Sequence, residues 1–218
     1  MTAEIGQQAP NLNVSKWVQG LPTNFDKEKD NVVLVEVFQV NCPGCFMYGI
    51  PEAIDIYKKF HLNGVTVLGL ATAFEDFDKN TIENLEKLLT TGEVIGDTYH
   101  TLSQSGNLDG NKLSYKIPFP VGMDSLIVFG EITQDKMSEF IKKQIPDFDS
   151  QPEQYKKEMF ERAREYMKAK KYTAETFENY ALRGTPSSIL VDRKGILQNV
   201  TFGQSVSLES SIKKLLDE

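Results

Sequence analysis

The chain has 218 residues, of which 40% are hydrophobic and 25% charged, and its formal net charge is −7. These values predict an ordinary globular protein with one large core, alone or with an insertion. The negative charge argues against nucleic acid and anionic membranes as partners, because both attract a basic face. No apolar run approaches the roughly 20 residues of a membrane span, and residues 1–14 lack the features of a signal peptide. We therefore expect a cytoplasmic location, or a periplasmic one if a leader has been removed.

The first predicted core element is a strand over Val32–Phe38, reached through an extended lead-in over residues 3–31. Its letters, VVLVEVF, form the continuous apolar run that is typical of a strand buried on both faces. The only two cysteines, Cys42 and Cys45, follow it, and from Ala53 the apolar residues recur at helical spacing. The pattern predicts a strand, a short turn and a helix whose first turn carries C-x-x-C.

The expected position of the cysteine pair at a helix N-terminus affects the reactivity of its thiols. A helix N-terminus presents free N–H groups and the positive end of the dipole, which favour a thiolate over a thiol. We expect Cys42 to be the exposed nucleophile with a lowered pKa, and Cys45, one turn later, to attack the mixed disulfide formed at Cys42. Pro43 suits the first turn, where its missing N–H costs nothing.

Two other readings fit the spacing of Cys42 and Cys45. The pair could be half of a zinc site, or two buried thiols that only pack. A structural zinc site needs two more ligands, and the chain offers no further cysteine and only His61 and His100, neither at ligand spacing. We therefore predict a redox pair and no metal.

Glu36 stands alone as a charge inside the first apolar strand. A carboxylate is unfavourable in a strand that is covered on both faces. A buried carboxyl of raised pKa could take the proton from Cys45 when that thiol attacks. The alternative is a solvent-facing Glu36 on an edge strand.

The remaining elements follow from periodicity and turn signals. Residues 65–71 read as a second buried strand, 80–91 as a helix, 92–116 as a long loop, 117–124 as a short strand, 133–180 as charged helices, 187–192 and 196–202 as a β-hairpin, and 208–216 as a closing helix. This order predicts an α/β layered fold with a central sheet.

Three stretches carry a family resemblance: NCPGC at 41–45, FPVGMD at 119–124 and YALRGTPSSILVDRKG at 180–195. Together they resemble the thioredoxin superfamily, most closely its TlpA-type (TlpA/ResA/DsbE-like) thiol–disulfide oxidoreductases. The resemblance implies a thioredoxin-like fold, a central mixed β-sheet flanked by helices, with thioredoxin-like parts at 1–125 and 180–218. Residues 126–179 would be a helical insertion before the cis-proline strand, similar to that of DsbA-like proteins.

The resemblance also implies a function and a site. It implies disulfide exchange with protein substrates, a redox partner protein and no cofactor. It predicts a cis bond between Thr185 and Pro186, where the proline would keep metal from the dithiol and the backbone of Thr185 would pair with an extended substrate. Pro43 and Gly44 would border the same groove and tune the reduction potential.

Two positions and the insertion add to this picture. Glu36 lies where the superfamily carries a buried acid beneath the disulfide, whereas Asn41 replaces the usual aromatic residue before the first cysteine. Because the insertion enters and leaves beside the cis-proline strand, we expect it to cap the groove over Cys42. The direction of electron flow does not follow from the sequence.

Two rival functions remain open. A peroxiredoxin-like peroxidase would carry a Pro-x-x-x-Thr/Ser-x-x-Cys pattern, but those positions hold Val35 and Gln39. A non-catalytic client-binding or copper-binding module is the second rival. A copper carrier would want a histidine near the thiols, and neither His61 nor His100 is obviously placed for that.

Overall fold

The computed structural model describes residues 2–128, 130–169, 171–205 and 207–218. The chain divides into two compact units: unit 1 is Met1–Leu126 with Ala174–Glu218, and unit 2 is Ile127–Thr173. The helical insertion was expected at 126–179; unit 2 lies within this range, and residues 129 and 170 lie outside the described residues. Helix α6 (Glu175–Asn179) belongs to unit 1 because Asp124 accepts hydrogen bonds from the N–H groups of Thr176 and Phe177, at 2.9 and 3.2 Å.

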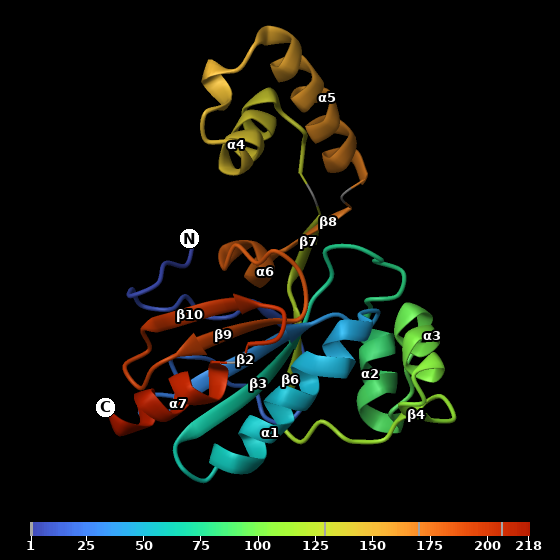
Figure 1. Ribbon diagram of the computed structural model, residues 1–218, viewed down its shortest axis with the longest axis vertical. Helices are drawn as coiled ribbons and strands as arrows, with labels where there is room; N and C mark the ends of the chain where they lie inside the picture. The colour runs from blue at the N-terminus through green and yellow to red at the C-terminus, as the bar shows by residue number, and fades with distance from the viewer. Residues whose placement is uncertain (1, 129, 170, 206) are drawn as a thin grey trace. The chain divides into compact units, whose positions relative to one another are not determined.

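A six-stranded sheet forms the centre of unit 1 (Figure 1). Its strand order is β1-β6-β3-β2-β9-β10, with bounds Val14–Gln19, Val121–Asp124, Val65–Ala71, Val32–Phe38, Ser187–Val191 and Leu197–Phe202 in that order. The β2–β3 and β3–β6 pairs are parallel, and the other pairs are antiparallel. The expected mixed central sheet is therefore confirmed, and β2 lies inside it between β3 and β9.

Helices flank this sheet, and β2 shows how the sequence divides between its two faces. Val32, Leu34 and Phe38 share a core with the buried residues of α1 (Ile50–Phe60) and α7 (Leu208–Asp217), which Figure 1 draws in front of the sheet. Val33, Val35 and Val37 share a second core with Phe177 and Tyr180. Successive strand residues point to opposite faces, so Glu36 falls on the α1 face.

The segment expected as a long loop at 92–116 is instead structured. After α2 (Ile82–Thr91) it forms α3 (Gly96–Gln104) and a hairpin of β4 (Leu108–Asp109) and β5 (Lys112–Leu113). We call residues 93–116 the lobe. The prediction was wrong because α3 buries only Thr98 and Leu102, too few apolar positions to give a helical period.

Unit 2 is a pair of helices with a small core of its own. Helices α4 (Gln134–Gln144) and α5 (Glu153–Ala169) are joined through a 3-10 turn, η2 (Phe148–Ser150). Their buried contacts are made by Met137, Ile141, Phe148, Ala163 and Met167. The segments that lead into and out of this pair, β7 (Leu126–Val128) and β8 (Tyr172–Ala174), form a two-stranded sheet.

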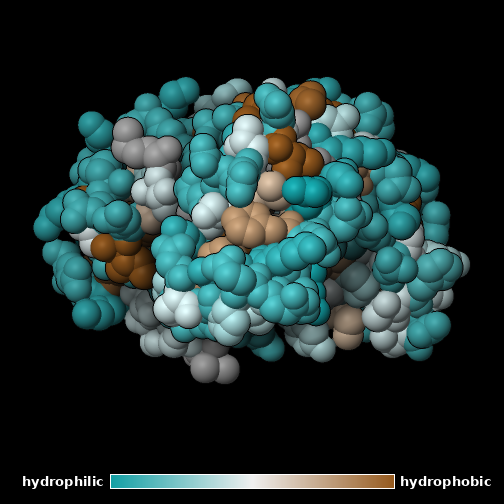
Figure 2. All heavy atoms as spheres, turned by 90° about the horizontal axis from the view of Figure 1, so that it is seen from above, coloured by the Kyte–Doolittle hydropathy of each residue, from teal (hydrophilic) through white to brown (hydrophobic). Residues whose placement is uncertain are grey.

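The surface agrees with the charged composition. In the view of Figure 2 most residues are hydrophilic, and hydrophobic ones gather in a few small groups. Within the described parts of the chain, no helix has both the length and the apolar character needed to cross a membrane.

Candidate redox site

The cysteine pair lies where β2 gives way to the helical segment before α1. Pro43 and Gly44 begin this segment, Cys45–Gly49 form a π-helical turn (η1), and α1 continues from Ile50. The prediction that C-x-x-C opens a helix is thus confirmed. The π-helical turn was not predicted; such turns occur often at functional sites.

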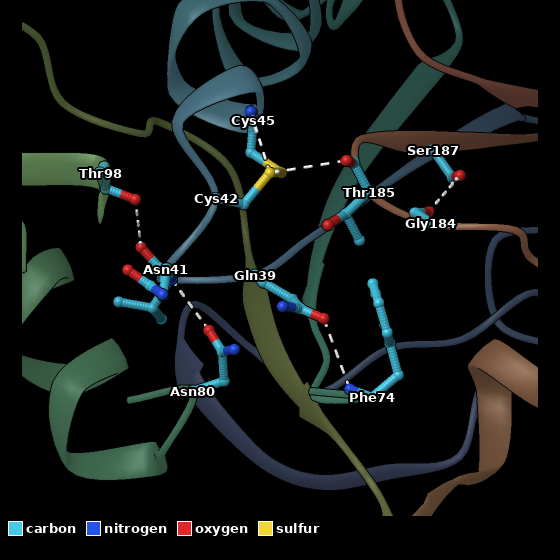
Figure 3. Close-up of a disulfide and its surroundings, with 11 residues drawn as sticks. Gln39, Asn41, Cys42, Cys45, Phe74, Asn80, Thr98, Gly184, Thr185 and Ser187 are labelled. Carbon is cyan, nitrogen blue, oxygen red and sulfur yellow. Dashed lines mark hydrogen bonds between the residues drawn. A yellow bond between two sulfur atoms is a disulfide. The ribbon is translucent and has the colours of Figure 1, made fainter. Parts of the chain in front are cut away.

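The two sulfurs differ in exposure. Cys42 and Cys45 form a disulfide with their Cα atoms 5.4 Å apart. Cys45 is 0% exposed, whereas Cys42 is only partly buried. The backbone N–H of Cys45 donates to Sγ of Cys42 at 3.2 Å (Figure 3). An N–H at a helix start stabilises negative charge on the sulfur it faces, so this geometry favours a thiolate at Cys42.

The loop before β9 lies against Cys42. The Thr185–Pro186 bond is cis, as expected from the resemblance. The carbonyl oxygen of Thr185 is 3.6 Å from Sγ of Cys42, and both are drawn in Figure 3. The loop is held by the hydroxyl of Ser187, which donates to the carbonyl of Gly184 at 2.7 Å. Residues far apart in the sequence therefore meet at the exposed sulfur.

Glu36 is buried in the centre of the sheet, so the alternative of a solvent-facing residue on an edge strand is wrong. Glu36 is 2% exposed, and burial raises its pKa to about 8. Ser188, its cross-strand partner, donates to Oε2 at 2.9 Å and opposes this rise, while Glu52 adds to it by charge repulsion. The other oxygen, Oε1, is buried without a hydrogen-bond partner among the described residues.

Gly49, the last residue of the π-helical turn, is the point at which the side chains of Glu36 and Pro186 both come close to the helix backbone. A Cβ atom at this position would lie 2.2 Å from Oε1 of Glu36 and 2.6 Å from Cβ of Pro186. Both distances are shorter than real contacts, so only glycine fits. Gly49 was not predicted from the sequence, although a glycine among helix-forming residues is a recognised sign of close packing.

The two histidines and the residues between the cysteines, Pro43 and Gly44, were also considered from the sequence as possible contributors to the site. His61 and His100 are exposed, and the ring of His61 stacks on Tyr57. Pro43 and Gly44 are half-buried beside the pair. Across the described residues, no group of three or more His, Cys, Asp or Glu side chains is arranged to hold a metal ion.

Three of the solved structures that are similar to this chain illustrate the match. A thioredoxin-like superfamily protein is 25% identical, with a TM-score of 0.60 over 97% of each chain. A thiol-disulfide isomerase from Corynebacterium glutamicum is 26% identical, with a TM-score of 0.59 over 98% of this chain and 97% of that one. A thiol:disulfide interchange protein of the thioredoxin family from Chlorobium tepidum TLS is 16% identical, with a TM-score of 0.51 over 99% of each chain, and shows the fold alone.

The chain belongs to the thioredoxin superfamily. No protein-family model matches the sequence, and no curated protein matches it. In this thioredoxin-superfamily protein, the disulfide-forming C-x-x-C and the named neighbours together support a thioredoxin-like redox function. They also support a redox enzyme in general terms, without a direction of electron flow.

Proposed function

We propose that the protein is a thiol–disulfide oxidoreductase that exchanges disulfides with cysteines of other proteins through Cys42 and Cys45. The observation that carries the proposal is the asymmetry of the pair. Sγ of Cys42 is partly exposed and receives a helix N–H, whereas Cys45 is fully buried one turn later. A nucleophile needs access and thiolate character, while a resolving thiol needs only reach.

When the protein reduces a client, the Cys42 thiolate attacks one sulfur of the client disulfide and forms a mixed disulfide with it. The other client sulfur is released as a thiolate, which takes up a proton. Cys45 then loses its proton and attacks Sγ of Cys42. The second client thiol leaves, and the Cys42–Cys45 disulfide remains. Two electrons pass to the client, and the reverse sequence oxidises it.

Glu36 is proposed to handle the proton of Cys45. Its pKa of about 8 lies close to the ordinary thiol pKa of about 8.5, and proton transfer is most useful between groups of matched pKa. Its Oε1 faces Gly49, four residues after Cys45 in the same helical segment. When the protein oxidises a client, the protonated carboxyl of Glu36 would donate its proton to the Cys45 sulfur as that sulfur leaves. When the protein reduces a client, the Glu36 carboxylate would accept the proton that Cys45 loses as it attacks.

The substrate is proposed to be an extended segment around a client cysteine. Thr185 and Pro186 line the side of Cys42 from which it would approach, since the Thr185 carbonyl is 3.6 Å from the sulfur. Backbone pairing with Thr185 would be independent of the client's side chains. Pro43 and Gly44 would border the same approach, and a redox partner protein would restore the pair.

Trapping with single-cysteine variants tests this proposal. Cys45→Ser should hold client proteins in mixed disulfides with Cys42, because the chain has no third cysteine to release them. Cys42→Ser should trap far less, since Cys45 is fully buried. Each variant is recovered from cells and compared by non-reducing electrophoresis with mass spectrometry of the adducts. Equal trapping would refute the nucleophile assignment, and none by either variant would favour a peroxidase or a binding module.

A further inference from the structure

We call residues 40–46, which contain both cysteines, the redox turn. The lobe contacts the N-terminal end of the redox turn, just before Cys42. The hydroxyl of Thr98 donates to the carbonyl of Val40 at 2.9 Å (Figure 3). The backbone N–H of Asp97 donates to Oδ1 of Asn41 at 2.7 Å, and Nδ2 of Asn41 donates back to Oδ2 of Asp97 at 3.2 Å. The first turn of α3 is thus bonded to the two residues before the nucleophile.

The backbone N–H and both side-chain amide groups of Asn41 are hydrogen-bonded. Its backbone N–H donates to Oδ1 of Asn80 at 2.8 Å, and its Nδ2 also donates to Oδ2 of Asp76 at 2.6 Å. Asn41 as a whole residue is 6% exposed. Gly96 has a φ of +55°, and a Cβ there would lie 2.3 Å from Oδ1 of Asn41, so glycine is needed for the contact. A buried amide with all its groups paired holds one orientation.

The lobe also contacts the redox turn on its C-terminal side, just after Cys45. The hydroxyl of Tyr115, at the end of the lobe, donates to the carbonyl of Phe46 at 2.8 Å. Burial raises the pKa of Tyr115, so the phenol keeps the proton that it donates. Phe46 itself is 1% exposed and lies in the π-helical turn. The two cysteines therefore lie between two anchor points on one lobe.

We propose that the lobe clamps the C-x-x-C turn and thereby sets the reduction potential of the Cys42–Cys45 couple, with Asn41 and Tyr115 as its positioning residues. The inference rests on the proposed disulfide exchange. A disulfide closes more readily when its two sulfurs are held at the closing distance, because the orientation entropy has already been lost. Fixing the turn on both sides of the pair, with Cα atoms 5.4 Å apart, therefore favours the oxidised form.

The equilibrium that measures this effect uses glutathione. The reduced protein and one oxidised glutathione give the Cys42–Cys45 disulfide and two reduced glutathiones, with two electrons and two protons passing to glutathione. Loosening the clamp should weaken ring closure roughly three- to tenfold, which raises the reduction potential by about 14–30 mV at 29.6 mV per tenfold change. The attack of Cys45 on a glutathione mixed disulfide at Cys42 should slow in proportion.

Three variants of the full chain test the clamp. Tyr115→Phe removes only the hydroxyl that reaches Phe46, and Asn41→Ala removes the amide contacts on the other side. Tyr180→Phe is the matched control. It also removes a buried tyrosine hydroxyl that donates to a backbone carbonyl, but that carbonyl belongs to Pro10 in the N-terminal segment and not to the redox turn. Each protein is equilibrated with graded glutathione ratios, and its oxidised fraction is read by thiol alkylation and mass spectrometry. Thermal unfolding of the oxidised forms is measured in parallel.

The expected result is a higher potential in Tyr115→Phe and Asn41→Ala and an unchanged one in Tyr180→Phe, although all three lose some thermal stability. The inference is overturned if Tyr115→Phe keeps the wild-type potential, or if Tyr180→Phe shifts it as much. These outcomes need a wild-type protein that exchanges with glutathione. A wild-type protein that does not exchange overturns the proposed function and, with it, the clamp.

Discussion

Glu36→Gln should change how the stability of the protein depends on pH. In the fold the carboxyl has a pKa of about 8, against an ordinary value near 4.5. Between these values the native state holds a proton that the unfolded chain has lost, so raising the pH favours unfolding. The contribution is fully present below about pH 4.5, is lost as the pH rises through 8, and amounts to about 5 kcal/mol over that range.

The assay is urea denaturation of oxidised wild-type protein and Glu36→Gln at several values between pH 5 and 9. The free energy of unfolding of the wild type, relative to that of the variant, should fall by about 1.4 kcal/mol per pH unit between pH 5 and 8 and then level off. Other titrating groups largely cancel in this difference. Ser188→Ala removes a hydrogen bond that lowers the pKa of Glu36, so it should move the levelling point to higher pH.

Glu36→Gln should also slow the attack of Cys45 on a mixed disulfide at Cys42. General acid–base help is worth roughly 10²–10⁴ in rate, and water that reaches the site would reduce the loss. Stopped-flow measurement of Cys45 attack on a Cys42 mixed disulfide supplies the rate. A wild-type pH slope of stability in Glu36→Gln would refute the burial argument, and a wild-type rate and pH profile would refute the proton-transfer role separately.

Three further results are expected. Gly49→Ala should destabilise the protein by about 1–3 kcal/mol and slow disulfide exchange, because the added Cβ overlaps Glu36 and Pro186; wild-type melting and activity would contradict this. Replacing residues 127–173 by a short Gly-Ser linker should leave a cooperatively folding protein by calorimetry, because they form a compact unit of their own, and should lower activity toward the natural client; unaltered activity would exclude a role in specificity. Peroxide consumption with a thiol reductant should be negligible, and rapid consumption lost in Cys42→Ser would favour the peroxidase instead.

The core strands and the redox helix could be predicted because their signals are local. Val32–Phe38 and 65–71 are continuous apolar runs that matched β2 and β3, and the hairpin at 187–202 was bounded by turn residues. The cis bond before Pro186 followed only from the resemblance, since most X–Pro bonds in folded proteins are trans. Glu36 could be recognised because a single charge interrupts an otherwise apolar strand.

The parts that escaped prediction depend on contacts between distant segments. The lobe lacks a hydrophobic period because α3 buries so few side chains, and only the fold brings Tyr115 to the carbonyl of Phe46. Asn41 could be seen to depart from the usual aromatic residue, but its partners Asp76 and Asp97 lie 35 and 56 residues further along the chain. The role of Gly49 likewise becomes visible only when Glu36 and Pro186 are both in place.

The most direct test of disulfide exchange is a single turnover with a peptide that contains an intramolecular disulfide. Reduced wild-type protein is mixed with an equal amount of peptide, quenched by acid and alkylation, and analysed by mass spectrometry. The account predicts that each peptide reduced is matched by one Cys42–Cys45 disulfide, that Cys45→Ser stops at a mixed disulfide on Cys42, and that Cys42→Ser leaves the peptide oxidised. Reduction that survives Cys42→Ser would contradict it, as would a wild-type protein that neither reduces this peptide nor, in its oxidised form, oxidises the dithiol form of the peptide.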